Sequence, residues 1–462
     1  MSKKNNVIIV GAGPAGIFAA LELLKGFDKD INILLLEKGK AIINRKCPMR
    51  EQKTVCQQCN PCSLLSGWGG GGAFSDGKLN LTSDFGGNLT DYIAEEELNN
   101  LIHYVDRLYC QFGAEDSLYG SNLKEIERVK REAVKANLKF IPARIRHLGT
   151  EQCFTVLKNI YDFLKDKIEI RTDCQVDRIV KEDNEVCGII TSGGEYIKGK
   201  NIILSPGRVG AEWLKNQALE LELPVFRNPV DVGVRVEVPA VIFEHLTDTL
   251  YESKLIYYSS SFDDKVRTFC MCPHGEVVME YNNGITTVNG HSYRNKKTDN
   301  SNFAILVSTT FTEPFQEPIA YGKYIANLAN ILSGGVIIQR LGDLILGRRS
   351  TSDRIAHSIV RPTLNSATPG DLSFVLPYRI LTDILEMLEA LNKIAPGVYS
   401  EQTLLYGAEV KFYSARLDLS QQLETKIKNL FAIGDGAGIT RGLVQASVSG
   451  VIVAREIRDN RL

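Results

Sequence analysis

The sequence of 462 residues has almost no net charge, because 54 lysine and arginine residues balance 55 aspartate and glutamate residues. This balance gives no reason to expect a nucleic acid or an anionic membrane as a partner. No stretch approaches the roughly 18 uninterrupted apolar residues of a membrane-spanning helix. A secretion signal is also missing, and we therefore expect a soluble cytoplasmic protein.

Internal repeats and a disulfide framework are missing as well. The ten cysteines lack the secretory context in which disulfides form, which favours thiols or metal ligands. The chain is too long for one compact core, so two domains are expected. Its apolar content of 44% and charged content of 24% are those of an ordinary globular protein.

The N-terminal segment has the order of strand, tight glycine turn and helix that a dinucleotide-binding unit requires. An apolar run at 7–10 precedes the turn, and a helical pattern starts at Ile17. The first glycine permits the sharp bend, the second lets backbone approach a pyrophosphate, and the third allows the helix to pack closely on the strand. The turn residues assigned to the dinucleotide are Gly11, Gly13, Pro14, Ala15 and Gly16.

A second apolar strand, at 31–36, ends in Glu37, which lies 21 positions after Gly16. An acidic side chain at this distance can accept hydrogen bonds from a ribose diol. A glycine turn alone is weak evidence, but the strand, helix and acid together favour a dinucleotide site over a turn without a ligand. Lys38, next to the acid, is included among the predicted cofactor contacts.

A second glycine motif, at 434–438, follows a buried strand near the end of the chain and precedes a helix rich in small residues. The pair of motifs resembles the two FAD signatures of the glutathione-reductase-like flavoproteins, which implies FAD and not NAD as the tightly bound cofactor. By that resemblance Asp435 binds the ribityl chain, and the helix near Gly442 directs its positive end at the flavin ring. The residues assigned to this part of the site are Gly434, Asp435, Arg441, Gly442 and Leu443.

A loop at 66–79, called here the glycine loop, contains six glycines together with Trp68 and Phe74. A flexible linker rarely carries aromatic residues and lysine at this density. In related flavoproteins the corresponding loop wraps the pyrophosphate and the flavin edge, and the resemblance therefore implies an FAD contact. It also implies backbone contacts from Val176 to adenine and places Gly207 near the cofactor. The loop residues assigned to FAD are Gly71, Gly72, Ser75 and Lys78.

Four cysteines fall within 16 residues just before this loop, namely Cys47, Cys56, Cys59 and Cys62. Four thiolates on a short segment can enclose a tetrahedral zinc or an iron–sulfur cluster. A distant cysteine followed by proline, which would complete a common cluster motif, is missing, and Cys47-Pro48 lies upstream instead. Three interpretations stay open: a metal or cluster site, a dithiol redox relay beside the flavin, and inert buried thiols.

The character of the sequence changes between 213 and 400, where alternating apolar patterns predict antiparallel strands. We therefore predict an α/β fold: a Rossmann-like FAD-binding domain with three layers and a parallel sheet, built from 1–212 and 401–462, with an inserted, mainly antiparallel substrate or cap domain at 213–400. No second dinucleotide motif follows the insert, so NADH or NADPH is expected only as a transient reductant. The predicted strands of the insert are 230–241, 255–258, 266–272, 276–281 and 303–311.

The segment 270–275 places two thiols and an imidazole at a predicted strand-to-turn junction. If the strand persists, Cys270, Cys272 and His274 share one face. Either His274 or His291 could deliver a proton while flavin N5 delivers or takes hydride; the alternative is that both are structural histidines. The predicted catalytic residues are His274, His291 and Cys272.

Motifs spread over most of the chain resemble the uncharacterised FAD-dependent dehydrogenase family of bacteria and archaea. They are the two glycine motifs, the cysteine-rich segment and the stretches 71–79, 270–273, 288–293 and 409–413. The resemblance implies an FAD-dependent oxidoreductase that transfers hydride between flavin N5 and a small-molecule substrate. The alternative is a flavin-based electron relay or redox sensor, in which the cluster Cys47–Cys62 exchanges electrons with FAD for a redox partner protein.

Overall fold

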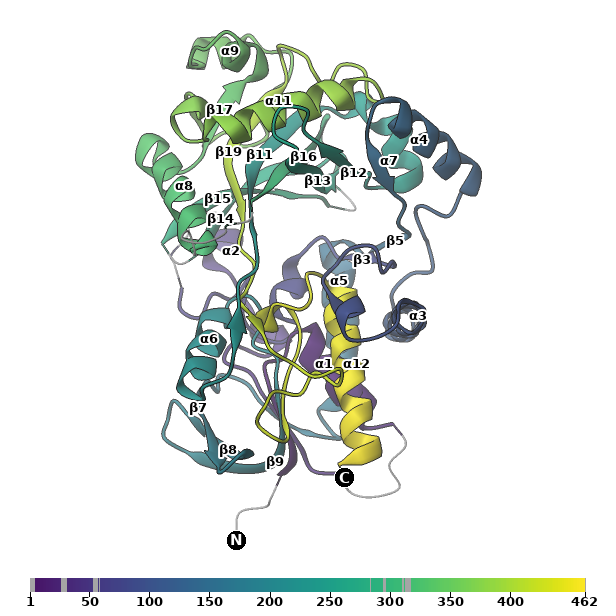
Figure 1. The fold of residues 1–462 in the computed structure, drawn as a ribbon, viewed down its shortest axis with the longest axis vertical. Coiled ribbons are helices and arrows are strands. Elements are labelled where there is room, and N and C mark those ends of the chain that lie inside the picture. The colour runs from purple at the N-terminus through teal and green to yellow at the C-terminus, as the bar shows by residue number, and fades with distance from the viewer. Residues whose placement is uncertain are drawn as a thin grey trace. The chain divides into compact units, whose positions relative to one another are not determined.

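The computed structural model describes residues 5–25, 31–52, 57, 59–282, 284–293, 296–309, 311 and 317–461. In these residues the chain has a mixed α/β fold with parallel and antiparallel sheets (Figure 1). It divides into two compact units. The first unit comprises 1–117, 146–228 and 414–462, and the second comprises 118–145 and 229–413. Within the described ranges, no helix combines the length and the apolar composition needed to cross a membrane.

The main elements of the first unit are β1 (Asn5–Val10), α1 (Pro14–Leu23), β2 (Ile33–Leu36), η2 (Gly70–Phe74), α3 (Glu95–Gln111), α5 (Gly149–Leu164), β6 (Glu169–Arg171), β7 (Val176–Glu182), β8 (Glu185–Thr191), β9 (Tyr196–Leu204), α6 (Ala211–Glu220), β10 (Val225–Phe226), β21 (Leu430–Ala432) and α12 (Leu443–Asn460). Those of the second unit are α4 (Leu123–Lys135), β4 (Lys139–Ile141), β11 (Val230–Pro239), β12 (Lys254–Tyr258), β13 (Lys265–Cys272), β14 (Glu276–Asn282), β15 (Ile285–His291), β16 (Asn300–Thr309), α8 (Pro318–Ser333), β17 (Ile337–Arg340), β18 (Thr368–Pro369), α11 (Tyr378–Asn392) and β19 (Leu404–Lys411).

The bounds of the two units differ from the expected domain bounds of 212 and 400. The second unit begins at Pro229, because α6 and β10 remain with the first unit, and it ends at Tyr413, because β19 belongs to its sheet. The segment 118–145, expected in the FAD-binding domain, also belongs to the second unit. Its strand β4 pairs with β12 at the edge of that sheet, a long-range pairing that local sequence patterns do not encode.

The sheet of the first unit has a parallel core in which β6, β2, β1, β9 and β21 run in the same direction. Strand β8 pairs with the beginning of β9, and β21 pairs with its end. The apolar runs that form β1 and β2 are fully buried, as expected for parallel strands that are covered on both faces. The strands from the two ends of the sequence therefore lie in one sheet.

Helices α1 and α12 lie side by side in the first unit (Figure 1). Their close approach depends on Gly450 of α12, where an added Cβ would lie 2.2 Å from the carbonyl oxygen of Ala15. On the other side of α1, a Cβ at Gly16 would lie 2.1 Å from the carbonyl oxygen of Gly11. Both glycines are required because the backbone leaves no room for a side chain.

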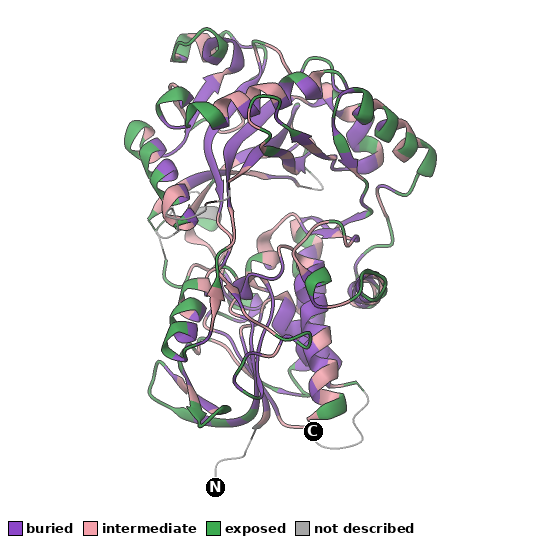
Figure 2. Ribbon diagram, in the orientation of Figure 1, coloured by how far each residue is buried: buried purple, intermediate pink, exposed green. Residues whose placement is uncertain are grey.

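The second unit is built on one large sheet with the strand order β18, β17, β19, β11, β16, β13, β12, β4. Helices α8 and α11 pack on this sheet, and the strands of both sheets are mostly buried while the outer faces of the helices are exposed (Figure 2). All five strands predicted for the insert are present. The mainly antiparallel character of the insert is confirmed, with β17 and β18 as a parallel pair.

Strand β11 lies at the centre of this sheet and has two buried faces of opposite character. Valines at every second position from Val230 to Val238 enter the hydrophobic core. The alternate positions carry Asp231, Arg235 and Glu237, whose side chains are also buried. Because neighbours along a strand point to opposite faces, this alternation separates an apolar layer from a layer of charged groups, called here the charged face.

Candidate functional site

The three glycine-rich segments that were assigned to FAD come together in the first unit. A Cβ built at Gly70 of the glycine loop would lie 3.3 Å from the Cα of Gly13. One built at Gly72 would lie 2.7 Å from Leu443, and one built at Gly434 would lie 3.0 Å from the Cβ of Ala15. The turn before α1, the glycine loop and the start of α12 therefore surround one location.

Backbone at this location has open space beside it. No atom lies within 4 Å of a Cβ built at Gly13, Gly71 or Gly207, although the neighbouring glycines are tightly enclosed. Gly13 has an ordinary negative φ, so the turn itself does not require a glycine there. A residue without a side chain at such a position suits a ligand that approaches the backbone closely, and the segments therefore fit a dinucleotide.

The carboxylate of Glu37 is buried at the end of β2 and accepts three backbone hydrogen bonds. The donors are the amides of Ala12 at 2.9 Å, Gly39 at 2.8 Å and Gly67 at 2.9 Å. This one side chain thus connects β2 with both the turn before α1 and the glycine loop. A carboxylate offers roughly four lone pairs, so one remains for a further donor. Burial lowers the pKa of the adjacent Lys38, although Glu37 opposes the effect.

Asp435 begins the C-terminal motif and accepts a hydrogen bond of 2.6 Å from the hydroxyl of Thr440. Burial raises the pKa of Asp435, and the Thr440 hydrogen bond together with the charges of Arg208 and Arg441 partly offsets this effect. The amide of Arg441 donates to the carbonyl of Gly86 at 2.7 Å, which fixes the segment that leads into α12. Gly442 is the N-cap of α12, and Leu443 is its first residue, as predicted for the helix start.

Arg45 is a site residue that the sequence analysis missed. Its buried guanidinium donates to four backbone carbonyls of the segment around the glycine loop, at 2.6 to 3.0 Å; they belong to Ser63, Leu64, Trp68 and Gly70. It also lies 4.9 Å from the centre of the Phe74 ring. Burial lowers its pKa to about 10. No motif surrounds Arg45, so no sequence signal distinguishes it from a surface arginine.

The other polar and aromatic residues of the glycine loop make contacts within the protein. Trp68 is fully buried and donates from its indole nitrogen to the carbonyl of Leu157 in α5, at 2.9 Å. The hydroxyl of Ser75 donates to the carbonyl of Gly72 at 2.9 Å, and Lys78 pairs with Asp76 at 3.0 Å. Trp68 therefore anchors the loop to the core and does not present a flat surface to a ligand.

The two remaining positions assigned to FAD lie at the same end of the sheet. Val176 is buried at the start of β7, and the residue two positions before it, Cys174, donates from its amide to the carbonyl of Glu37 at 2.9 Å. Gly207 has φ +63, and a Cβ built at Gly436 would lie 2.7 Å from its carbonyl oxygen. Both positions therefore lie next to segments of the cofactor site.

The predicted metal ligands Cys47, Cys59 and Cys62 are free thiols; Cys59 is exposed and the other two are half-buried. Cys56 lies outside the described residues. In the part of the chain that the structure describes, none of these three thiols belongs to a group of converging metal-ligating side chains. The metal site at Cys47, Cys56, Cys59 and Cys62 thus stays a prediction.

The structure corrects the expected geometry of the thiol and histidine segment in the second unit. Strand β13 ends at Cys272, and a bulge precedes this residue. His274 lies in the following turn with a left-handed φ of +49, so it does not continue a strand face. Its Nδ1 lies 3.0 Å from the carbonyl of Thr298, while His291 is buried with its ring edge-on to Tyr293.

The charged face of the second unit also escaped the sequence analysis. Arg235 is completely buried and makes two hydrogen bonds to the carboxylate of Glu409, at 2.7 and 2.8 Å. Lys411 lies 2.9 Å from the same carboxylate. Arg235 also donates to the carbonyl of Cys270 and to the side chain of Asn302. Two cations thus share one buried carboxylate in the middle of a sheet, which is unusual for a purely structural core.

Comparisons with known proteins give a consistent picture. Residues 229–412 match a family model described as FAD-dependent protein, C-terminal domain-like. A protein from Clostridium beijerinckii is 27% identical over 487 aligned residues, which cover 98% of this chain and 81% of that protein. The family-model match supports an FAD-dependent enzyme, as the sequence predicted.

Solved structures with a related fold include two oxidoreductases. The first is a formate oxidase, with a TM-score of 0.46 and 12% identity over 100% of this chain and 99% of the other. The second is an L-proline dehydrogenase from P. horikoshii, with a TM-score of 0.42 and 12% identity over 100% of this chain and 95% of the other.

Proposed function

We propose that the protein is an FAD-dependent oxidoreductase that transfers hydride between flavin N5 and a small organic substrate, without a dedicated NAD(P)H-binding domain. In this proposal the first unit is a Rossmann-like, three-layered FAD-binding domain, and the second unit supplies the substrate site. The observation that carries the proposal is the meeting of the two glycine motifs and the glycine loop around backbone with open space beside it. The family-model match supports the same cofactor.

The residues of the first unit would divide the cofactor among them. The free amides at the start of α1 would face the pyrophosphate, where helix N-termini favour anions. Glu37 would accept from the adenosine ribose, and Asp435 from the ribityl chain. The start of α12, at Gly442 and Leu443, would turn a positive helix end toward the ring. Once bound, FAD supplies the two-electron chemistry that no side chain of this protein provides.

The second unit offers two histidines for proton transfer. His274 engages one ring nitrogen with a carbonyl, which leaves Nε2, 3.8 Å from Glu244, as the atom that can exchange a proton. His291 is buried and is the alternative. Cys272 is buried beside Arg235, and its role is developed below. NADH or NADPH would act as a transient reductant.

The test of the cofactor site is substitution of Gly13 by valine. The backbone at Gly13 is extended and unstrained, so the side chain fits the fold but fills the space proposed for the pyrophosphate. We expect purified wild-type protein to show flavin absorption at stoichiometric FAD and G13V to lose it. The matched control is G193V, at an open hairpin position where the nearest atom to a Cβ lies 3.7 Å away. Retention of stoichiometric FAD by folded G13V contradicts the proposed site.

A second measurement separates hydride transfer from electron relay. Anaerobic titration with NADH and NADPH should bleach the flavin bands if a pyridine nucleotide serves as the reductant. Iron and acid-labile sulfide should be absent if the cysteines before the glycine loop are plain thiols. Iron and sulfide in amounts stoichiometric with FAD would favour the relay, with a redox partner protein as its electron acceptor.

A further inference from the structure

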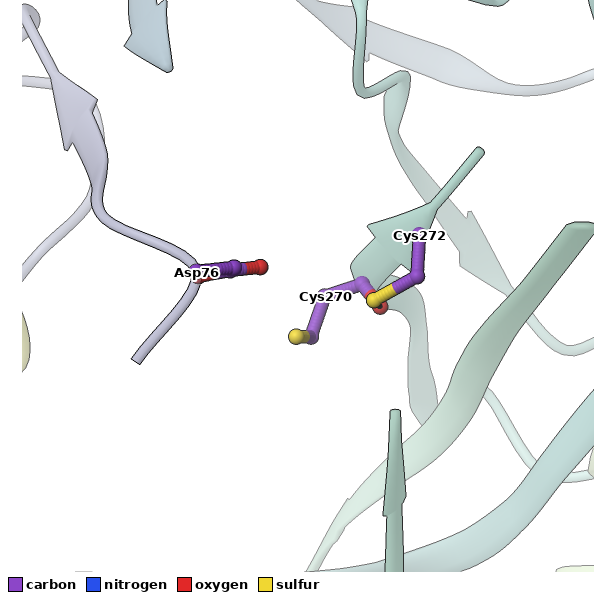
Figure 3. A group of neighbouring side chains, drawn as sticks. All are labelled: Asp76, Cys270 and Cys272. Atoms are coloured by element: carbon purple, nitrogen blue, oxygen red, sulfur yellow. Dashed lines mark hydrogen bonds between the residues drawn. The ribbon is translucent and has the colours of Figure 1, made fainter. Parts of the chain in front are cut away.

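The second unit holds a pair of thiols that the proposed oxidoreductase reaction does not require. Cys270 and Cys272 are separated by one residue at the end of β13, and both side chains are drawn in Figure 3. Their sulfur atoms lie within 4.8 Å of each other. A disulfide joins cysteines whose Cα atoms are about 4.4–6.8 Å apart, so a pair at this spacing needs only a small movement to close.

The backbone brings the two thiols together. Phe269 pairs with Ala304 of β16 and Cys272 pairs with Asn302, so three steps along β13 match two steps along its neighbour. The extra residue forms a bulge in which Cys270 has a left-handed φ of +45. Bulges of this kind redirect a side chain from its usual place in the strand alternation. The local sequence Cys-Met-Cys in a regular strand would not have this geometry.

The surroundings of the thiols are electropositive. Arg235 donates to the carbonyl of Cys270 at 2.8 Å, and it interacts electrostatically with both thiols. Three further cations lie around the ring of the neighbouring Phe269: Arg267 at 4.7 Å, Lys254 at 5.0 Å and Lys411 at 5.8 Å from its centre. Positive charge stabilises a thiolate, the form of cysteine that attacks disulfides.

The two thiols differ in access. Cys272 is completely buried, whereas Cys270 is half-buried. An attacking thiol must be reached by an external molecule, while a resolving thiol only has to reach its neighbour. The geometry assigns the first role to Cys270 and the second to Cys272.

We propose that Cys270 and Cys272 form a redox-active dithiol that exchanges electrons with low-molecular-weight disulfides. The Cys270 thiolate attacks one sulfur of the external disulfide, which breaks its S–S bond and releases one thiol. The Cys272 thiolate then attacks the mixed disulfide, forms the Cys270–Cys272 bond and releases the second thiol. The protein pair loses two electrons and two protons, and the external disulfide gains them and becomes two thiols. This activity does not depend on FAD.

The experiment uses the full-length protein in glutathione buffers of increasing oxidised-to-reduced ratio, followed by acid quenching, alkylation and peptide mass spectrometry. We expect a reversible intramolecular disulfide between Cys270 and Cys272, while Cys153, whose pKa is raised by burial to about 12, stays reduced. In C272S, a glutathione adduct should accumulate on Cys270 because the resolving thiol is gone. A C110S variant, which removes another half-buried cysteine, should leave the disulfide unchanged.

Alkylation rates of the wild-type protein give a readout that needs no variant. Because of its electropositive surroundings, Cys270 should react with iodoacetamide faster at neutral pH than Cys110, whose pKa is raised by burial. A pair that stays reduced in every buffer overturns the proposal. So does a Cys270 thiol that reacts no faster than Cys110.

Discussion

Replacement of Arg45 by methionine tests how much a single buried cation contributes to the cofactor site. The arginine donates four hydrogen bonds to carbonyls around the glycine loop, and methionine keeps the apolar length of the side chain but none of the donors. If each bond contributes roughly 0.7 kcal/mol net, the loop loses about 3 kcal/mol of stabilisation. The loop would then no longer be held in the conformation in which it contacts the turn before α1.

The expected consequence is a weaker apparent affinity for FAD. When a ligand binds only the ordered conformation, its apparent dissociation constant rises in proportion to the loss of that conformation, and 3 kcal/mol corresponds to roughly a hundredfold. The assay is titration of the apoprotein with FAD, followed by the quenching of flavin fluorescence. Thermal unfolding followed by circular dichroism shows in parallel whether the variant is folded.

Two further variants serve as controls for this prediction. R45K keeps the positive charge but cannot reach all four carbonyls with one ammonium, so we expect an affinity between those of R45M and the wild type. R128M removes an arginine that pairs with Glu125 and Glu132 on α4, away from the glycine loop, and should bind FAD normally. An R45M protein that is folded and binds FAD within about threefold of the wild type refutes the reasoning.

Two other predictions concern stability. In G450V, the new side chain meets the Ala15 carbonyl at 2.2 Å, so the α1–α12 contact must open; we expect a loss of about 3 kcal/mol in urea unfolding, and an unchanged midpoint would show that the contact is not needed. Burial, together with the neighbouring carboxylate of Asp264, raises the pKa of Asp383 from 3.8 to about 6. A raised pKa means that the folded state holds the proton more tightly, so this contribution to stability is complete below pH 3.8 and is lost as the pH rises through 6. At pH 8, D383N should be more stable than the wild type by about 1–2 kcal/mol, and the difference should vanish at pH 4; equal unfolding curves at both pH values would contradict it.

The parts of the fold that follow from local sequence were predictable. The order of strand, glycine turn and helix around Gly11 to Gly16 depends on neighbours in the chain, and so does the helix that starts at Leu443. Strand β11 was equally legible, because its alternating valines mark one apolar face. These segments signal their structure through periodicity and turn chemistry alone.

The features that sequence analysis missed depend on contacts between distant residues. Arg45 gains its role from carbonyls that a folded loop brings to it, and Arg235 from Glu409 on a neighbouring strand. The segment 118–145 joins the second unit through a strand pairing with β12. Trp68 was misread because an aromatic residue in a glycine-rich loop has no pattern that tells the core from a ligand surface.

The pairing of α1 with α12 has a consequence for how the protein is made. Synthesis proceeds from the N-terminus, so β1 and α1 leave the ribosome long before the residues that cover them. Until α12 emerges, Ala15 and the apolar face of α1 have no partner, and the edge of β9 that receives β21 is unfilled. The nascent first unit therefore cannot complete its nucleotide pocket during translation, and cofactor loading must wait for the finished chain. Truncation within α12 should for the same reason yield aggregation-prone, colourless protein.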